Sequence, residues 1–225
     1  MKTVIGRYLL LILTLCAFFA AMTFGIVKRQ TYKDTLKQED YLDQLLVGAL
    51  WEEYLEHQCT NIQQSLPEAP IILRVETVGE IEHLFNVDRQ RVVIREIYAG
   101  TGLETGEEVY LFSRKWQLSL DGYYDSLERG YVNILEVGTE YLVFAEEVLE
   151  DLRGDLPAIR MHDHEILISP VFCYEERQNA IVPVTGDTTF VPYKDVRNNE
   201  FFVTSEKALE MMEDLKSRML SLYPR

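Results

Sequence analysis

The segment His162-Asp-His-Glu165 contains the residues of this chain whose types and spacing come nearest to metal chemistry. If the segment is a β-strand, His162 and His164 point to the same side, because side chains two positions apart share a face. Imidazole and carboxylate groups bind zinc, and Asp155 or Glu175 is a candidate third ligand. Such spacing does not distinguish zinc from copper or nickel, and an exposed polar loop explains the same residues. A metal site at His162 and His164 is therefore the second hypothesis for this chain.

No residue pattern in the sequence indicates catalysis. His57 lies two positions before Cys59 on a predicted helix, where such neighbours face different directions. The stretch from Gly100 to Gly106 is rich in glycine, but it lacks the Lys-Ser/Thr pair and the following helix of a phosphate-binding loop. Paired carboxylates in so acidic a chain are more typical of a solvated face than of an acid/base couple. We therefore expect no enzymatic activity and no cofactor.

Two cysteines, Cys59 and Cys173, follow the apolar N-terminal segment, which itself contains Cys16. A bridge between Cys59 and Cys173 would close a long loop and stabilise the fold by about 4–5 kcal/mol in the chain-entropy model. Two independent buried thiols fit the sequence equally well, because it does not show whether their Cα atoms come close. Both alternatives stay open.

Tyr8 to Val27 is a run of 20 uncharged residues with basic residues on both sides. A helix of this length spans the hydrocarbon core of a bilayer at ~1.5 Å per residue. The run exceeds the ~7–15 apolar residues of a signal peptide and has no good cleavage site. We therefore expect residues 8–27 to be an uncleaved single-pass anchor in the cell membrane. The Lys and Arg counts favour a cytoplasmic main domain, but large domains translocate largely regardless of charge, and we expect an extracytoplasmic one.

The formal net charge of the chain is −15 at pH 7. Nucleic-acid binding needs clustered Lys and Arg that contact phosphates, and a field of this sign repels phosphate. We therefore expect no nucleic-acid partner.

Four regions follow one another along the chain. Residues 1–29 form the predicted anchor, and the spacing of leucines in residues 30–66 predicts a juxtamembrane amphipathic helix. Residues 67–203 contain short β-rich runs separated by glycine and proline, and residues 204–225 are predicted to form a C-terminal helix that Ser205 caps.

The β-rich region is organised around a predicted hairpin. Val92–Tyr98 and Glu108–Phe112 are rich in β-branched and aromatic residues, and the glycines between them indicate a loop of more than two residues. Polar and apolar residues alternate over Ile71–Ile81, which is typical of an antiparallel strand with one solvated face. We expect a turn at Asn86–Arg89 and a helical turn at Glu146–Arg153. These patterns predict a mainly β fold with flanking helices, of the α+β class.

Three motifs carry a resemblance to a known family. Val93-x-Arg-Glu-Ile-Tyr-Ala-Gly100, Gly106-Glu-Glu-Val-Tyr-Leu111 and Leu135-Glu-Val-Gly-Thr-Glu-Tyr-Leu-Val-Phe144 are similar to motifs in the OB-like barrel of tissue-inhibitor-of-metalloproteinase and netrin modules. The resemblance covers roughly residues 71–147. It extends to bacterial membrane-anchored proteins that carry such a barrel.

The resemblance implies a small antiparallel OB-like β-barrel, preceded by the transmembrane helix and followed by the C-terminal helix. It also implies a protease-inhibitor-like module, which is the third functional hypothesis. Inhibition in that family depends on a mature N-terminal cysteine that binds the zinc of the target enzyme and on several disulfides, and this chain lacks both.

The leading hypothesis is a membrane-anchored, extracytoplasmic interaction or scaffold module without catalytic activity, which binds a protein partner at the cell envelope. An OB-like barrel does not by itself specify a ligand. A group of aromatic residues near the predicted barrel is either a ligand platform or core filling: Tyr110, Trp116, Tyr123, Tyr124 and Tyr131.

Overall fold

The computed structural model of the chain describes residues 2–31, 46–48, 52–84, 87–113, 126–127, 134–149, 156–162, 170–182 and 190–225. These residues belong to two compact units, Met1–Tyr41 and Leu42–Arg225.

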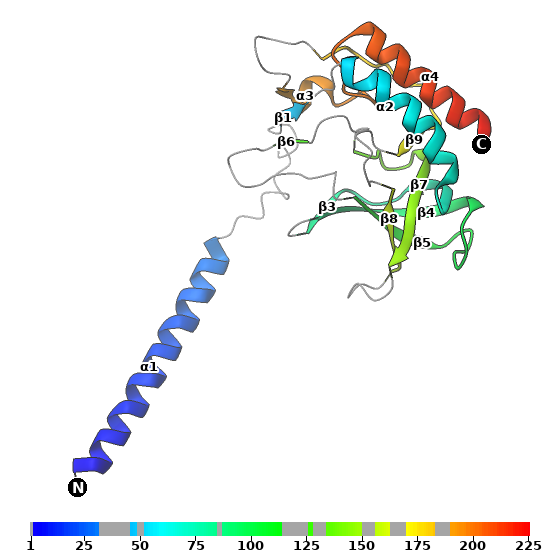
Figure 1. Ribbon diagram of the computed structural model, residues 1–225. Coiled ribbons are helices and arrows are strands. Elements are labelled where there is room, and N and C mark those ends of the chain that lie inside the picture. Colours follow the sequence, from blue (N-terminus) through cyan, green and yellow to red (C-terminus); the bar gives the residue numbers. More distant parts are fainter. Residues whose placement is uncertain are drawn as a thin grey trace. The chain divides into compact units, whose positions relative to one another are not determined.

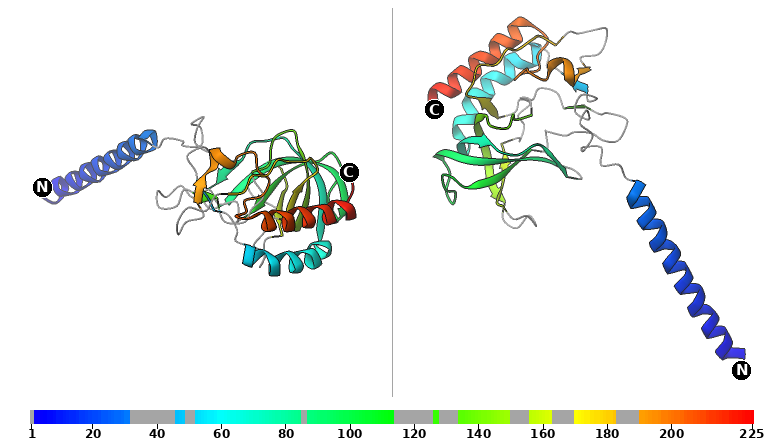
Figure 2. Two further views of the ribbon diagram at one scale, coloured as in Figure 1. Left: turned by 90° about the horizontal axis from the view of Figure 1, so that it is seen from above. Right: turned by 180° about the vertical axis from the view of Figure 1, so that it is seen from behind.

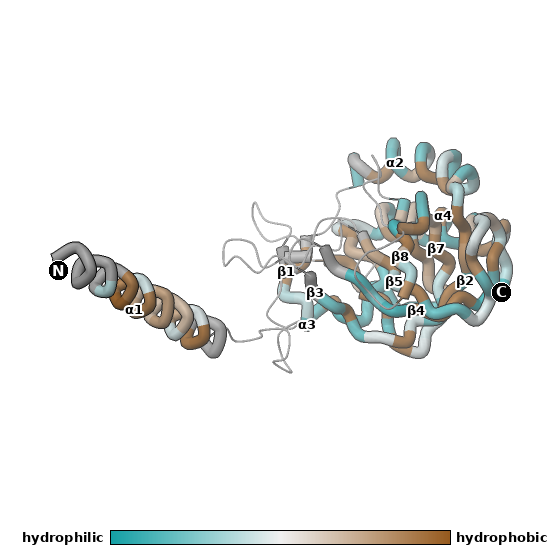
Figure 3. The backbone as a smooth tube through the Cα atoms, turned by 90° about the horizontal axis from the view of Figure 1, so that it is seen from below, coloured by the Kyte–Doolittle hydropathy of each residue, from teal (hydrophilic) through white to brown (hydrophobic). Residues whose placement is uncertain are grey.

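The first unit contains one described helix, α1 (Lys2–Thr31). Its described side chains, those of Tyr8 and Leu11–Val27, are all exposed, and many of them are apolar (Figure 3). Among the helices in the described part of the chain, none combines the length and the hydropathy that crossing a membrane requires. Membrane insertion of residues 8–27 stays a prediction from the sequence.

The second unit is built on a closed five-stranded barrel (Figure 1). Its strands are β2 (Ile71–Thr77), β4 (Val87–Ala99), β5 (Glu108–Ser113), β7 (Glu140–Leu149) and β8 (Ala158–Met161). They follow one another around the ring in the order β2-β4-β5-β8-β7, and β7 pairs with β2 to close it. All neighbours in the ring are antiparallel except β5 and β8, which are parallel. The mainly β prediction is confirmed at this level.

The barrel closes because its strands bend and because buried and exposed side chains alternate along them. Leu73, Val75 and Thr77 of β2 are buried inside, whereas Arg74 and Glu76 are partly exposed on the outside. The pairing of β2 with β4 shifts twice, which places an extra residue on β4 at each shift. Such bulges bend a strand and increase its twist, and thereby let a sheet curl into a ring.

The predicted hairpin is confirmed as β4 and β5. Gly100, Gly102 and Gly106 in the connection have φ angles of 127°, 77° and 89°. Residues with a side chain rarely adopt such positive φ angles, so the glycines serve the backbone of a hairpin loop.

Arg74 joins three strands of the barrel on its outer face. Its guanidinium contacts Glu96 of β4 and Glu140 of β7, each at 3.0 Å, and Glu140 also contacts Arg225 at 3.0 Å. These partly buried pairs favour the observed register, because opposite charges lie close to each other across neighbouring strands.

Two helices lie side by side against the barrel (Figure 2). They are α2 (Glu52–Ser65), which runs into the short helix η3 (Leu66–Glu68), and α4 (Glu206–Leu222). The apolar stripe of α4 is buried through Ala208, Met212, Leu215 and Met219. The predicted cap is confirmed, because the Ser205 hydroxyl accepts a hydrogen bond from the Ala208 amide at 3.1 Å.

Shorter elements complete the described part of the second unit. β3 (Glu82–Leu84) pairs with β4, and β9 (Val171–Cys173) pairs with β7. A separate small sheet has the order β10-β1-β6, formed by β10 (Phe190–Pro192), β1 (Leu46–Gly48) and β6 (Ser126–Leu127). The helix α3 (Tyr193–Val196) follows β10 directly.

Three local predictions are wrong, each because a distant partner determines the structure. The predicted helix of residues 30–66 is interrupted by β1, which pairs with β10 and β6. The predicted turn at Asn86–Arg89 belongs from Val87 onward to β4. The predicted helical turn at Glu146–Arg153 is instead the end of β7 as far as Leu149, where the strand pairs with β8. Short apolar or acidic stretches contain too few residues for their periodicity to predict the structure reliably, and pairing with another strand then determines it.

Candidate functional site

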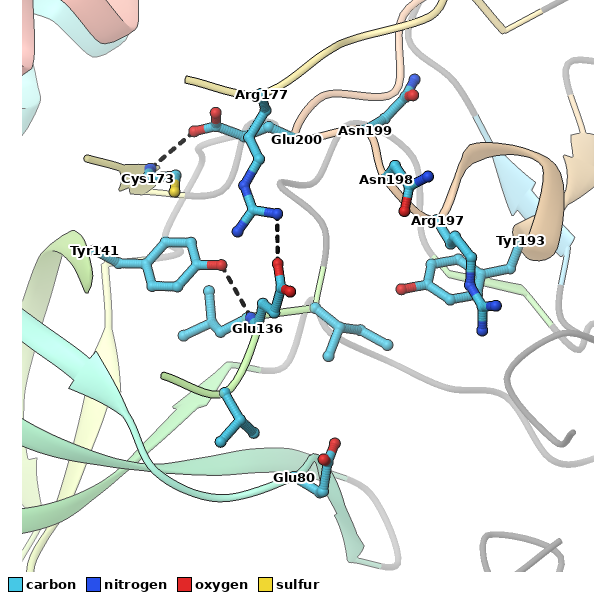
Figure 4. A pocket seen from close by; sticks show the side chains of 13 residues that line it. Glu80, Glu136, Tyr141, Cys173, Arg177, Tyr193, Arg197, Asn198, Asn199 and Glu200 are labelled. Carbon is cyan, nitrogen blue, oxygen red and sulfur yellow. Dashed lines mark hydrogen bonds and ion pairs between the residues drawn. The ribbon is translucent and has the colours of Figure 1, made fainter. Parts of the chain in front are cut away.

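A polar cavity of about 360 Å³ lies beside the barrel (Figure 4). One wall is the segment Leu135–Val137 with Tyr141 of β7, and the facing wall is the segment Arg197–Glu200 that follows α3. Cys173 of β9 and Arg177 also line it. The volume is near the lower end of the ~300–1,000 Å³ range of small-molecule sites.

The first wall is held in place by a buried glutamine. The Gln90 side chain of β4 donates to the Leu135 carbonyl and accepts from the Leu135 amide, both at 2.9 Å. The Tyr141 hydroxyl accepts a hydrogen bond from the Glu136 amide at 2.9 Å. A side chain that satisfies both backbone groups of one residue replaces a strand partner, so this wall has a defined position without being a strand.

The facing wall is held by two asparagines. The Asn179 side chain accepts hydrogen bonds from the amides of Glu200 and Phe201 at 2.7 and 3.2 Å. The Asn199 side chain accepts from the Ala180 amide at 3.1 Å and donates to the Phe201 carbonyl at 3.3 Å. These bonds join the chain around residue 180 to the chain around residue 200.

Two arginines, Arg177 and Arg197, line the cavity, and Arg177 lies between its two walls (Figure 4). It is ion-paired with Glu136, and their side chains are 22% and 60% exposed; its second nitrogen is 3.5 Å from the Thr139 hydroxyl. Burial alone would lower the pKa of Arg177, but its hydrogen bonds to Cys173 and Glu136 outweigh that effect and raise it. The guanidinium is therefore permanently charged, and the side chain of its carboxylate partner Glu136 is mostly exposed. A dashed line in Figure 4 marks the ion pair between the two residues.

A buried ion pair forms the floor between the cavity and α4. Glu200 accepts a hydrogen bond from the Cys173 amide at 2.8 Å and contacts Lys216 of α4 at 2.5 Å. Their side chains are 2% and 15% exposed. Lys216 also donates to the Glu175 carbonyl at 2.9 Å. Burial raises the pKa of Glu200, whereas Lys216, the hydrogen bond from the Cys173 amide and the charge of Arg177 oppose that rise, so Lys216 is the main group that favours the charged carboxylate.

The Cys173 thiol is not a nucleophile in this setting. It is 1% exposed, and burial raises its pKa despite the hydrogen bond from the Glu175 amide and the nearby Arg177. The reactive form of cysteine is the thiolate, which a raised pKa suppresses at neutral pH. The described residues that line the cavity include no histidine that could act as its base.

The two cysteines that the sequence left open as a disulfide pair are both free thiols. Cys59 lies on α2 and is half-buried, and burial, followed by the charge of Asp214, raises its pKa to about 11. The alternative of independent thiols therefore describes Cys59 and Cys173 in this structure.

Of the two predicted metal ligands, only His162 is described. Its Nδ1 atom is 3.4 Å from Glu146 of β7, and its amide donates to the Phe144 carbonyl at 3.0 Å. His164 and the candidate ligand Asp155 lie outside the described residues. Within the described ranges, no three histidine, cysteine or acidic side chains are grouped so as to hold a metal ion. The metal site stays a prediction.

Among the five predicted aromatic residues, only Tyr110 on β5 is described. The guanidinium carbon of Arg89 lies 3.7 Å from the centre of its ring, so this ring is covered by a cation of the neighbouring strand. Trp116, Tyr123, Tyr124 and Tyr131 lie outside the described residues.

Apart from Cys173, which the sequence offered as a disulfide candidate, the sequence did not indicate the functional residues of the cavity. Arg177 stands in a polar stretch after β9, and Glu200 is one carboxylate among 37 acidic residues. Neither residue belongs to a sequence motif or to a periodic pattern. The residues that surround each of them in the structure come from segments far apart in the chain.

No protein-family model matches the chain, and no curated protein matches it at a significant level.

Proposed function

We propose that this protein is a membrane-anchored, extracytoplasmic binding module without catalytic activity, and that the cavity at Arg177 receives part of a protein partner at the cell envelope. The observation that carries this proposal is the state of the groups in the cavity. Arg177 and Glu200 are each engaged in an ion pair, and burial raises the pKa of the Cys173 thiol, which favours its protonated form at neutral pH.

General acid/base catalysis requires a group that exchanges a proton near neutral pH within reach of the reacting atoms. Arg177 does not release its proton. Burial raises the pKa of Glu200, but this side chain is 2% exposed and is enclosed by Lys216 and the Cys173 amide. Such groups recognise charge and hydrogen-bonding partners, which is the chemistry of binding.

The strand order of the barrel supports an OB-like fold. Numbered along the chain, the five strands of the ring follow the order 1-2-3-5-4, and the third and fifth are parallel. This is the arrangement of OB barrels, which serve many proteins as a binding scaffold. The fold is compatible with a binding function in general, and the residues of the particular site determine which ligand is bound.

The properties of α1 support an anchor. Large apolar side chains such as Phe18, Phe19 and Leu15 are exposed along it, and burying each would contribute roughly 1.5–3 kcal/mol. Basic residues flank the apolar run on both sides. A lipid bilayer accommodates such a helix, because its backbone hydrogen bonds are satisfied internally.

The test is photocrosslinking from the mouth of the cavity in intact cells. A photoreactive amino acid replaces Val137, which is 45% exposed at the cavity, in the full-length protein. We expect a protein adduct of defined mass that disappears when Arg177→Gln is added and persists with Arg218→Gln. Arg218 is a matched control, because it forms an exposed ion pair with Asp214 on α4.

The same photoreactive residue at Thr105, in the exposed β4–β5 loop, serves as the positional control. Identical adducts from both positions, or adducts at Val137 that do not depend on Arg177, would contradict the proposal.

A further inference from the structure

The two partners of the ion pair between Arg177 and Glu136 differ in their exposure to solvent. The Arg177 side chain is 22% exposed and its Glu136 partner is 60% exposed. Leaving a largely buried charge unpaired is costly, whereas an exposed carboxylate regains its hydration in water. Arg177 therefore needs a carboxylate in the cavity, but that carboxylate need not be Glu136.

The remaining surface of the cavity suits a short stretch of peptide. Asn198 lines the wall opposite Leu135–Val137 and supplies an amide, and Ile134 and Val137 supply apolar surface on the other side. A cavity of about 360 Å³ has room for the end of a chain and not for a folded loop. Guanidinium groups bind planar carboxylates with two parallel hydrogen bonds.

The charge of the whole protein restricts the partner further. A net charge of −15 repels acidic molecules and attracts basic ones over long distances. A ligand that presents one carboxylate to Arg177 must therefore carry compensating positive charge elsewhere.

From these observations we infer that the cavity binds the C-terminal end of a basic partner chain, whose terminal carboxylate replaces Glu136 on Arg177. The inference rests on the proposed binding function and names the chemistry of the partner. Glu136 acts as a built-in competitor, which occupies Arg177 until the partner arrives. The apolar side chain of the last partner residue contacts Val137, and basic residues upstream face the acidic surface.

Fluorescence anisotropy with the purified full-length protein in detergent tests this inference. The probe is a fluorescein-labelled peptide, Lys-Lys-Ala-Ala-Leu, with either a free C-terminal carboxylate or a C-terminal amide. We expect saturable binding of the free acid and at least about tenfold weaker binding of the amide, because the amide cannot form the charge-assisted pair.

Two substitutions shift the affinity in opposite directions. Arg177→Gln removes the carboxylate partner and weakens binding of the free acid about tenfold or more, whereas Glu136→Gln removes the competitor and strengthens it. A merely structural defect would weaken binding in both variants. Arg218→Gln, with the same change of charge outside the cavity, leaves the affinity within about twofold of wild type.

Several results would overturn the inference. They are equal binding of acid and amide, no saturable binding of either, or a decrease in affinity for Glu136→Gln. Acetyl-leucine distinguishes a small carboxylate from a chain end: competition as strong as that of the unlabelled peptide would show that the site recognises a small acid. Peptide binding can fail while photocrosslinking from Val137 succeeds, so the partner chemistry and the proposed function are tested separately.

Discussion

At the scale of single residues, the ion pair between Glu200 and Lys216 is the interaction whose loss we expect to affect stability most. Both side chains are largely removed from water, and they connect β9 to α4 through the Cys173 amide. A buried pair adds little net stability over apolar residues of the same size, but the loss of one member leaves an uncompensated charge in the interior.

We predict that Lys216→Ala lowers the free energy of unfolding by about 3–5 kcal/mol at neutral pH. Lys207→Ala is the control, because Lys207 pairs with Glu52 and Glu56 on the exposed surface and its loss has a much smaller effect. Denaturant unfolding of the two variants measures the difference. Equal midpoints for both variants would refute a structural role for the buried pair.

The same variant gives a pH dependence of defined sign. Burial raises the pKa of Glu200 in the folded protein, and Lys216 opposes that rise. A pKa that is higher in the folded than in the unfolded state means that the folded state binds the proton of Glu200 more tightly. The protonation of Glu200 therefore stabilises the folded state at low pH, and this contribution is lost as the pH rises through the folded pKa. We expect Lys216→Ala to regain part of its lost stability relative to wild type as the pH falls from 7 toward 5. Midpoints measured across this range check the prediction, and a difference that does not vary with pH would refute it.

At the scale of elements, α4 depends on how its first turn begins. Ser205 has an extended backbone, and its side chain accepts a hydrogen bond from the Ala208 amide. The Ser205 hydroxyl also donates to Glu52 of α2 at 3.0 Å. One side chain therefore both starts α4 and joins it to α2.

We predict that Ser205→Ala lowers the stability of the protein by about 1 kcal/mol, as is typical for the loss of an N-cap. Ser221→Ala is the matched control, because the Ser221 hydroxyl bonds only to the Ser217 carbonyl on the exposed face of the last turn and Ala has a higher helix propensity. Thermal unfolding followed by circular dichroism compares the two variants. A loss for Ser221→Ala as large as that for Ser205→Ala would contradict the assignment of the cap.

At the scale of the whole molecule, the prediction concerns the side of the membrane on which the proposed anchor places the barrel. Cys173 is buried and Cys59 is half-buried, so neither native thiol reports accessibility well. The exposed β4–β5 loop accepts a reporter cysteine at Thr105 without disturbing a strand.

We predict that Thr105→Cys in the full-length protein is labelled by a membrane-impermeant maleimide in intact cells, whereas Lys2→Cys is labelled only after lysis. The wild-type chain supplies the background from its native thiols. The opposite pattern would place the barrel in the cytoplasm, and labelling of both positions after lysis alone would mean that neither end lies outside.

Local chemistry determined several elements from the sequence alone. The loop between β4 and β5 needs positive φ angles at Gly100, Gly102 and Gly106, which glycine adopts readily. These glycines therefore indicate the β4–β5 hairpin without any knowledge of the strands that pair with it. Ser205 and the apolar stripe of α4 specify a capped helix, because both signals lie within a few residues of one another. The alternation along β2 likewise fixes which of its faces is buried.

The tertiary structure decided what depends on distant pairing. The parallel pairing of β5 with β8, the strand β1 and the end of β7 all rest on partners that no local period reveals. The cavity is the clearest case, because Glu136, Arg177 and Asn199 line it from three separate segments. Composition and spacing predicted a mainly β fold with flanking helices, and only the folded chain brought the charge of Arg177 into a cavity.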